Sequence, residues 1–310
     1  MRKHDHLAYY DRQTGALRTE EAYAGSFLFW AYNTRLGGAI THLLLRQKLV
    51  SQLYGWCQNQ RWSRPKIRAF VERFDVNVDE FVCPLEHFTS FNQFFTREID
   101  LSKRPITADP YICVAPADGK LLAYPAVDID RTFRIKGASF NLCRFLRDDA
   151  LAAQYAGGSM VISRLSFADY HHFHFPDSGV PGHAGPIQGK YYAVGPYALT
   201  RPVPFYAENY RMVTLFNSDH FGQIAMVEIG AFAVGSVHQR YQPGIHVTKG
   251  ARKGFFQIGG STVVLLFRRG AVTIDHDLCQ NTQQGMETYV RVGDSIGRVS
   301  PAGDKQNAER

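Results

Sequence analysis

The sequence predicts an α+β protein, with a helical N-terminal segment followed by a β-rich, largely antiparallel core. Apolar residues recur at helical spacing through most of the first hundred positions. After Pro105 the pattern changes to short β-rich runs that Gly and Pro interrupt. With 310 residues, 45% of them hydrophobic, the chain can bury a substantial core. We expect a helical region over residues 1–104 and a β-rich domain over 105–310.

The most apolar stretch, residues 26–50, predicts a membrane-facing amphipathic helix. Its apolar side chains recur at helical spacing at Phe29, Tyr32, Leu36, Ile40 and Leu43. Arg35 and Arg46 interrupt the stretch, so its uncharged runs are shorter than the roughly 20 residues that a membrane-spanning helix needs. Such a helix either packs on a core or lies in the membrane interface. The basic flanks favour the interface.

Shorter elements follow in order. The runs SRPKIRAFVERF and SFNQFFTREI predict two helices, with Pro65 in a first turn and Ser90 as an N-terminal cap. Five later runs combine β-formers with Gly or Pro boundaries and predict strands: KLLAYPAV, SMVISRL, NYRMVTLF, QIAMVEIGAFAVGSV and STVVLLF.

The charge of the chain limits the classes of partner, and its cysteines limit the disulfide and zinc sites that we expect. The 35 basic residues exceed the 28 acidic ones, which favours an anionic partner such as a phospholipid surface or nucleic acid, although a mild surplus is also common on a solvated surface. The five cysteines are odd in number and form no C-x-x-C pair, so the sequence predicts neither a disulfide framework nor a zinc knuckle. The N-terminus shows no secretory signal.

Two stretches carry residues suited to proton transfer. In APADGKLLAY, Asp118 lies in an Asp-Gly turn before a strand, which by itself is usually only a turn. RLSFADYHHFHFPDSG gathers His171, His172 and His174, and histidine exchanges protons near neutral pH. Further metal ligands at a suitable spacing are not apparent, so we predict no metal site.

The spacing of the histidines leaves two geometries open. On a strand, His172 and His174 would share a face, whereas on a helical turn His171 and His174 would meet. The preceding Ser166 to Asp169 segment resembles a capping box that opens a short helical turn. We therefore expect His171 and His174 to converge.

A third stretch, GGST, precedes an apolar run. A glycine-rich bulge at the entrance to a strand is the ordinary interpretation. Because Gly260 has no side chain, however, its carbonyl carbon is open to attack by the hydroxyl of Ser261 if the turn is strained. Ser261 does not lie in a G-x-S-x-G motif, which argues against an ordinary serine hydrolase.

Five motifs, in this order along the chain, resemble the phosphatidylserine decarboxylase family: SFNQFFTREI, APADGK, YHHFHFPDSG, GAFAVGSV and GGSTVVLLF. The likeness covers most of the chain. His172 stands where many members have Arg, and Gly259 stands where some have Leu or Met. Neither position is expected to perform chemistry.

The resemblance implies a self-processing, pyruvoyl-dependent carboxy-lyase. Ser261 would attack the carbonyl of Gly260, cleave the chain between these two residues and become a covalent pyruvoyl cofactor. His174 is implied as the base for cleavage and Asp118 as the group that orients it. His171 is implied to assist decarboxylation, through a Schiff base between the pyruvoyl group and the substrate amine.

The resemblance also implies products and partners. Cleavage would divide the protein into a β chain, residues 1–260, and an α chain, residues 261–310, that stay associated. Phosphatidylserine would become phosphatidylethanolamine and CO2. An anionic phospholipid membrane is the expected partner, on the cytoplasmic face of a bacterial cell membrane, with no nucleic acid. A homodimer is left open.

Two alternatives remain. Related chains use the same centre to decarboxylate soluble amino acids. The other alternative is an unprocessed, membrane-associated scaffold, against which the presence of Asp118, His171, His174 and Ser261 counts.

Overall fold

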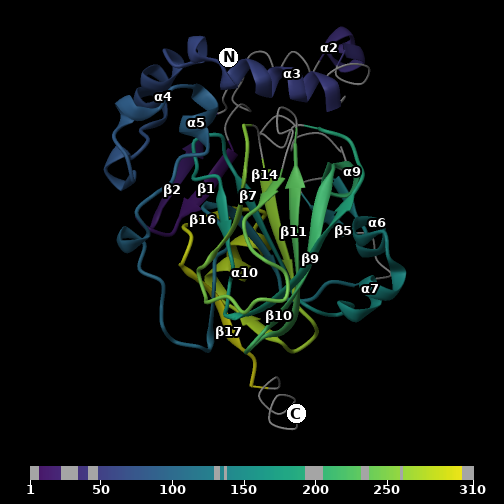
Figure 1. The fold of residues 1–310 in the computed structure, drawn as a ribbon. Coiled ribbons are helices and arrows are strands. Elements are labelled where there is room, and N and C mark those ends of the chain that lie inside the picture. The colour runs from purple at the N-terminus through teal and green to yellow at the C-terminus, as the bar shows by residue number, and fades with distance from the viewer. Residues whose placement is uncertain are drawn as a thin grey trace.

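The computed structural model describes residues 7–21, 34–40, 48–128, 133–135, 138–192, 205–231, 237–258 and 261–301. A nine-stranded sheet with the order β2-β1-β16-β4-β7-β14-β11-β10-β9 forms the centre of the molecule (Figure 1). All neighbours in it are antiparallel except β1 and β16, which pair in parallel. Its strands are β1 (Leu7–Asp11), β2 (Ala16–Glu20), β4 (Gly119–Tyr124), β7 (Met160–Leu165), β9 (Gly179–Ile187), β10 (Arg211–Ser218), β11 (Gly222–Gly230), β14 (Ser261–Leu266) and β16 (Glu287–Val290).

Three smaller sheets accompany the main one. They join β12 (Val237–Gln239), β13 (Arg252–Phe256) and β8 (His172–His174); β15 (Val272–Ile274), β17 (Ser295–Val299) and β3 (Ile112–Val114); and β5 (Phe133–Ile135) and β6 (Ala138–Phe140). The α-helices are α2 (Arg35–Ile40), α3 (Lys48–Asn59), α4 (Lys66–Phe74), α5 (Phe91–Phe95), α6 (Leu142–Leu146), α7 (Asp149–Gln154), α9 (Phe205–Glu208) and α10 (His276–Gln283). Short 3-10 turns are η2 (Arg61–Ser63), η3 (Val78–Glu80), η4 (Leu85–His87) and η5 (Leu101–Lys103). The predicted α+β class is confirmed.

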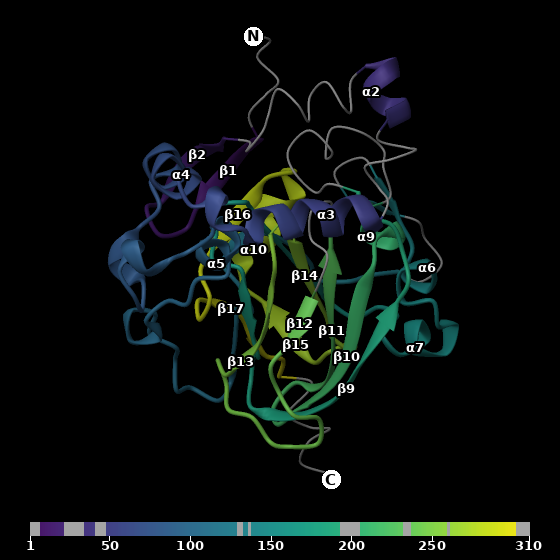
Figure 2. The ribbon, with the colours of Figure 1, turned by 45° about the horizontal axis from the view of Figure 1, so that its top comes forward.

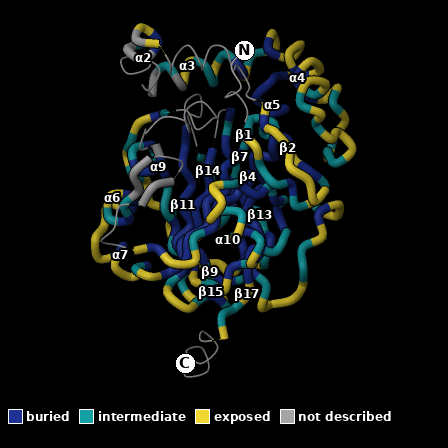
Figure 3. The backbone as a smooth tube through the Cα atoms, turned by 180° about the vertical axis from the view of Figure 1, so that it is seen from behind, coloured by how far each residue is buried: buried dark blue, intermediate teal, exposed yellow. Residues whose placement is uncertain are grey.

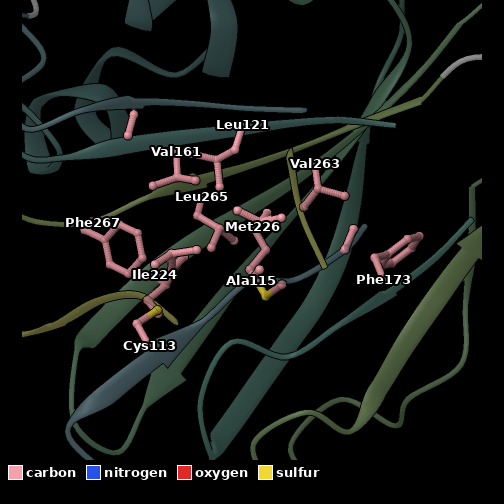
Figure 4. Packing of buried hydrophobic residues seen from close by; sticks show 14 of the residues in the cluster. Cys113, Ala115, Leu121, Val161, Phe173, Ile224, Met226, Val263, Leu265 and Phe267 are labelled. Carbon is pink, nitrogen blue, oxygen red and sulfur yellow. The ribbon is translucent and has the colours of Figure 1, made fainter. Parts of the chain in front are cut away.

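The central strand β14 is buried on both faces, which explains why its sequence is continuously apolar. Val263 and Leu265 pack into one hydrophobic cluster, shown in Figure 4, and Val264 and Leu266 pack into a second cluster on the opposite face. Figure 3 shows the same contrast, with buried central strands and exposed surfaces on the outer helices α4, α6 and α7. Strand β14 therefore contributes side chains to the hydrophobic clusters on both faces of the sheet.

The N-terminal helices gather at one end of the sheet. Helix α3 crosses above the strand ends in both Figure 1 and Figure 2, and it contacts α5. Phenylalanines of α4 and α5 form a separate hydrophobic cluster with Ile258, just before β14. Ser90 caps α5 as predicted, because its hydroxyl accepts a hydrogen bond from the amide of Gln93. Pro65 lies at the N-cap of α4, one residue before the predicted first turn.

The N-terminal region differs from the prediction in one respect. Strands β1 and β2 form a hairpin that the sequence analysis did not predict, and this hairpin extends the main sheet. Of the predicted interfacial helix, α2 and the first residues of α3 are described, whereas Phe29, Tyr32 and Leu43 lie outside the described residues. A membrane-facing helix over residues 26–50 is thus not confirmed. No described helix is both long and apolar enough to span a bilayer.

Candidate active site

Ser261 is the first residue of β14 and is completely buried. It pairs with Leu165 of β7 on one side and with Gly230 of β11 on the other. These pairings place Ser261 where β7 and β11 both end, since Leu165 and Gly230 are the last residues of those strands. Gly259 and Gly260 lie outside the described residues, so the predicted strained turn stays a prediction.

His171 is the histidine that contacts Ser261. Its Nδ1 lies 3.1 Å from Oγ of Ser261, and its ring stacks on Phe95 of α5 with centroids 3.8 Å apart. Burial, and next the positive charge of Arg97, lower the pKa of His171 well below its ordinary value. A neutral imidazole at this position can hold or accept a proton beside Ser261.

His172 and His174 lie on a strand rather than on a helix, and His171 directly precedes this strand. Ser166 to Asp169 form a turn in which the Asp169 carboxylate accepts a hydrogen bond from the Ser166 amide at 2.6 Å. His172–His174 then form β8, which pairs with β13. A helical turn that would bring His171 and His174 together is therefore not found here: His171 contacts Ser261 and Phe95, whereas His174 contacts Gly250 and Tyr170.

His174 is held by two groups on its own face of the strand. Its Nδ1 lies 2.9 Å from the carbonyl oxygen of Gly250, and its Nε2 lies 3.2 Å from the hydroxyl of Tyr170. Burial lowers the pKa of His174 to about 4, against the effect of the hydrogen bond to Gly250. The imidazole is consequently neutral at pH 7.

His172 occupies the same face and stacks on Tyr170, with parallel rings 4.9 Å apart. Its Nε2 lies 3.0 Å from the carbonyl of Thr96, just after α5. Burial lowers the pKa of His172 to about 4, so the ring is neutral at pH 7 and does not supply a positive charge. Its contacts fix the Tyr170 ring instead.

Asp118 lies at the start of β4 in a network of buried ions. Its carboxylate accepts hydrogen bonds from Arg104 at 3.1 Å and from the amide of Val292 at 2.7 Å. Arg104 also pairs with Glu80 at 2.6 Å. Burial raises the pKa of Asp118 to about 6, although Arg104 and the Val292 amide oppose this shift.

The predicted cleavage residues share one end of the sheet without forming a continuous triad. Across the described part of the chain, no hydrogen bond joins Asp118 to His174, and none joins either residue to Ser261. The single predicted pair in direct contact is His171 with Ser261.

A second buried ion pair supports the turn before the histidines. Lys120, two residues after Asp118, lies 3.1 Å from the Asp169 carboxylate and donates to the Ser166 hydroxyl at 2.6 Å. The APADGK motif therefore positions the histidine segment through Lys120, and also through the Pro116 carbonyl, which accepts a hydrogen bond from the His174 amide at 2.7 Å. A direct strand pairing between β4 and β7 keeps these groups in register.

Three contributors to the site were missed by sequence reasoning: Phe95, Tyr170 and Arg104. The spacing of Tyr170, His172 and His174 was a usable signal, because alternate residues share one face of a strand. Phe95 lies within the SFNQFFTREI motif, and Arg104 directly precedes Pro105. Their partners in the site lie far away in the chain, so local pattern did not indicate these contacts.

The environment of residue 261 fits a pyruvoyl group formed there. Nδ1 of His171 lies within hydrogen-bond distance of the buried Ser261 hydroxyl, and it could bind a carbonyl-bearing group formed at that position. Among the described residues, no three His, Cys, Asp or Glu side chains gather in a way that could hold a metal ion.

Comparison with known proteins agrees with this geometry. The family model for phosphatidylserine decarboxylase matches residues 91–298. A phosphatidylserine decarboxylase proenzyme of Chlamydia trachomatis serovar L2 is 42% identical over 292 residues, covering 94% of this chain and 97% of the relative. The corresponding proenzyme of Clostridium beijerinckii is 39% identical over 288 residues, covering 93% and 97%. The chain therefore belongs to the phosphatidylserine decarboxylase family.

Proposed function

We propose that the protein is a phosphatidylserine decarboxylase proenzyme that cleaves itself between Gly260 and Ser261. The mature enzyme then converts phosphatidylserine to phosphatidylethanolamine and CO2. The observation that carries this proposal is the 3.1 Å contact between His171 and Ser261 at the first residue of a buried strand. It places a proton-transfer group against the residue that both steps require.

Self-cleavage uses atoms of the chain and one water molecule. Oγ of Ser261 adds to the carbonyl carbon of Gly260, and the acyl group moves from nitrogen to oxygen as an ester. Loss of the α-proton of residue 261 expels the Gly260 carboxylate and leaves dehydroalanine. Tautomerisation to an imine, followed by hydrolysis, releases ammonia and leaves a pyruvoyl group whose ketone oxygen comes from water.

We assign the two steps to different histidines. His174 serves as the base in cleavage and Asp118 supports it electrostatically, in line with the family pattern. His171 serves decarboxylation, since its Nδ1 lies beside residue 261, where the ring can take up a proton and then deliver it to the carbon that loses CO2. The pyruvoyl group itself would supply a ketone that binds the substrate amine and withdraws the electron pair released with CO2.

The two pieces should remain together after cleavage. In the α chain, β14 lies between β7 and β11 of the β chain. Burial of its apolar side chains contributes roughly 1.5 to 3 kcal/mol each. Arg164 of the β chain also binds Glu287 of the α chain through two hydrogen bonds. No covalent link is then needed.

A membrane surface is the proposed location of the substrate. Leu53, Trp56 and Trp62 of α3 and η2 are 62%, 59% and 58% exposed, which is unusual for such large apolar side chains. Lys66 lies over the Trp62 ring, so aromatic and basic groups share this surface. Helix α3 also contacts α5, which carries the Phe95 that stacks on His171. We propose peripheral binding to the cytoplasmic face of a bacterial cell membrane.

Intact mass spectrometry of the wild type beside Ser261→Ala tests the proposal. We expect fragments corresponding to residues 1–260 and 261–310 from the wild type, the second with a pyruvoyl end, and a single full-length chain from the variant. A scaffold would stay uncleaved in both. Release of CO2 from phosphatidylserine vesicles, and not from free serine, separates the lipid from a soluble substrate. Light scattering of the same sample tests for a homodimer.

A further inference from the structure

We propose that Tyr170 is a positioning residue for self-cleavage: its hydroxyl, together with the carbonyl of Gly250, fixes the plane of the His174 ring. This inference rests on the proposed role of His174 in cleavage. Tyr170 is 2% exposed and immediately precedes the histidine cluster.

The tautomer of His174 follows from its two partners. The carbonyl oxygen of Gly250, 2.9 Å from Nδ1, can only accept a hydrogen bond, so Nδ1 carries the proton. In a neutral ring Nε2 then presents a lone pair. The Tyr170 hydroxyl, 3.2 Å from Nε2, must therefore be the donor. The ring is thus held in one plane at both nitrogens, and the Tyr170 hydroxyl must turn away from Nε2 before His174 can accept a proton.

Tyr170 is itself fixed in place. Its ring is parallel to that of His172 within 4°, with centroids 4.9 Å apart. His172 is in turn anchored through Nε2 to the carbonyl of Thr96. Burial raises the pKa of Tyr170, so its hydroxyl remains protonated and available as a donor at neutral pH. A buried donor with a fixed ring orients its acceptor better than a mobile one.

Tyr170 occupies the place in which an orienting carboxylate was expected. Asp118 is bound by Arg104 and by the Val292 amide, yet Asp118 and Tyr170 line the same cavity of about 310 Å³. The Tyr170 hydroxyl makes the contact to His174, and the negative charge of Asp118 helps to raise the pKa of this hydroxyl. Charged or titratable groups that act on Tyr170 and His174 come from several elements: Arg97, Glu98, Asp118, His172 and Arg252.

Tyr170→Phe tests the inference, with Tyr155→Phe as the matched control. Tyr155 is equally buried in the second hydrophobic cluster, and its hydroxyl makes no hydrogen bond within the described residues. The cleavage rate of newly synthesised protein is followed on denaturing gels across a pH series. We expect Tyr170→Phe to slow cleavage about tenfold, the effect of one hydrogen bond, and Tyr155→Phe to match the wild type.

The pH profile separates positioning from a general structural effect. The Tyr170 hydrogen bond favours neutral His174, so its loss should raise the pKa of His174 and move the acid limb of the cleavage profile to higher pH. A slower rate with an unmoved limb, or an unchanged rate, would overturn the inference. If His174→Ala cleaves normally, the proposed role of His174 fails instead, whatever Tyr170→Phe does.

A second measurement does not depend on cleavage. Nitrogen-15 NMR of the uncleaved Ser261→Ala protein reports which ring nitrogen of His174 is protonated. We expect Nδ1–H in both proteins, because the Gly250 carbonyl is unchanged, and a shift of the unprotonated Nε2 signal once Tyr170→Phe removes its hydrogen bond. An identical His174 spectrum in both proteins would overturn the inference.

Discussion

Nδ1 of His171 lies 3.1 Å from Oγ of Ser261, whereas His174, three residues later, is bonded to Tyr170 and Gly250. The two histidines thus have different neighbours despite their closeness in the chain. This separation allows one histidine to serve the step that forms the cofactor and the other to serve turnover. Each assignment can be tested independently.

Alanine substitution should divide the two activities. His171→Ala should still cleave but lose about 10²- to 10⁴-fold in the rate of CO2 release, the usual effect of removing a general acid or base. His174→Ala should remain one uncleaved chain. Denaturing gels and CO2 release from phosphatidylserine vesicles measure both. If His171→Ala fails to cleave and His174→Ala cleaves, the roles are reversed, as the direct contact with Ser261 would then explain.

Phe95→Leu should weaken decarboxylation more than cleavage. The Phe95 ring holds the plane of His171 through a stack with centroids 3.8 Å apart. Leucine fills much of the volume but cannot stack, so we expect kcat for CO2 release to fall about tenfold. Phe216→Leu is the control, since Phe216 is equally buried and packs against Phe175. Equal kcat values in the two variants would contradict the role of the stack.

Asp118 should make the folded protein less stable as the pH rises from about 4 to about 6. Burial raises its pKa from 3.8 to about 6, so within this range the folded state binds more protons than the unfolded state. The free energy of unfolding should fall by an amount on the order of 3 kcal/mol and then level off. Denaturant unfolding of uncleaved Ser261→Ala, with and without Asp118→Asn, measures this. Parallel pH profiles for both proteins would contradict it.

Glu20 should have the opposite dependence on pH. Burial raises its pKa, but Arg164, with further contributions from Lys120 and Ser166, lowers it from 4.5 to about 2. Its stabilisation is present above pH 4.5 and is lost as the pH falls towards 2. Glu20→Gln should cost roughly 3 kcal/mol at pH 7, because it leaves part of the buried Arg164 charge unpaired.

The neighbouring Glu21 supplies the control for this pair. It binds Arg73 at the surface, where both side chains are about half exposed. Glu21→Gln should cost less than about 1 kcal/mol. Equal losses from Glu20→Gln and Glu21→Gln in denaturant unfolding would show that the buried ion pair does not secure the β1–β2 hairpin.

Trp56→Ala combined with Trp62→Ala should reduce binding to vesicles that contain anionic lipid. Removing two large exposed apolar side chains should weaken binding at least about tenfold. Tyr111→Ala is the control, because Tyr111 is 55% exposed beside β3, which pairs with β17 at the opposite end of the molecule (Figure 1). Co-sedimentation measures binding. Equal binding by all three proteins would place the membrane contact elsewhere.

The local sequence pattern was sufficient to predict several elements of the fold. The continuous apolar run after Ser261 predicted a buried strand, and β14 is that strand. Ser90 predicted the start of α5, because a cap depends on residues within one turn. The β1–β2 hairpin was not predictable in this way, since its place in the sheet depends on β16, more than 250 residues later.

The residues proposed to carry the chemistry, among them Asp118, His171, His174 and Ser261, could be named from residue type and motif alone, because reactivity belongs to the side chain. Which of them touch could not be predicted, because His172–His174 form a strand instead of a helical turn, and His171 and His174 have different partners. The pairing of β8 with β13 fixes the strand conformation of this segment, and such pairings join segments that are far apart in the chain. Contacts such as Phe95 with His171 and Tyr170 with His174 accompany that conformation.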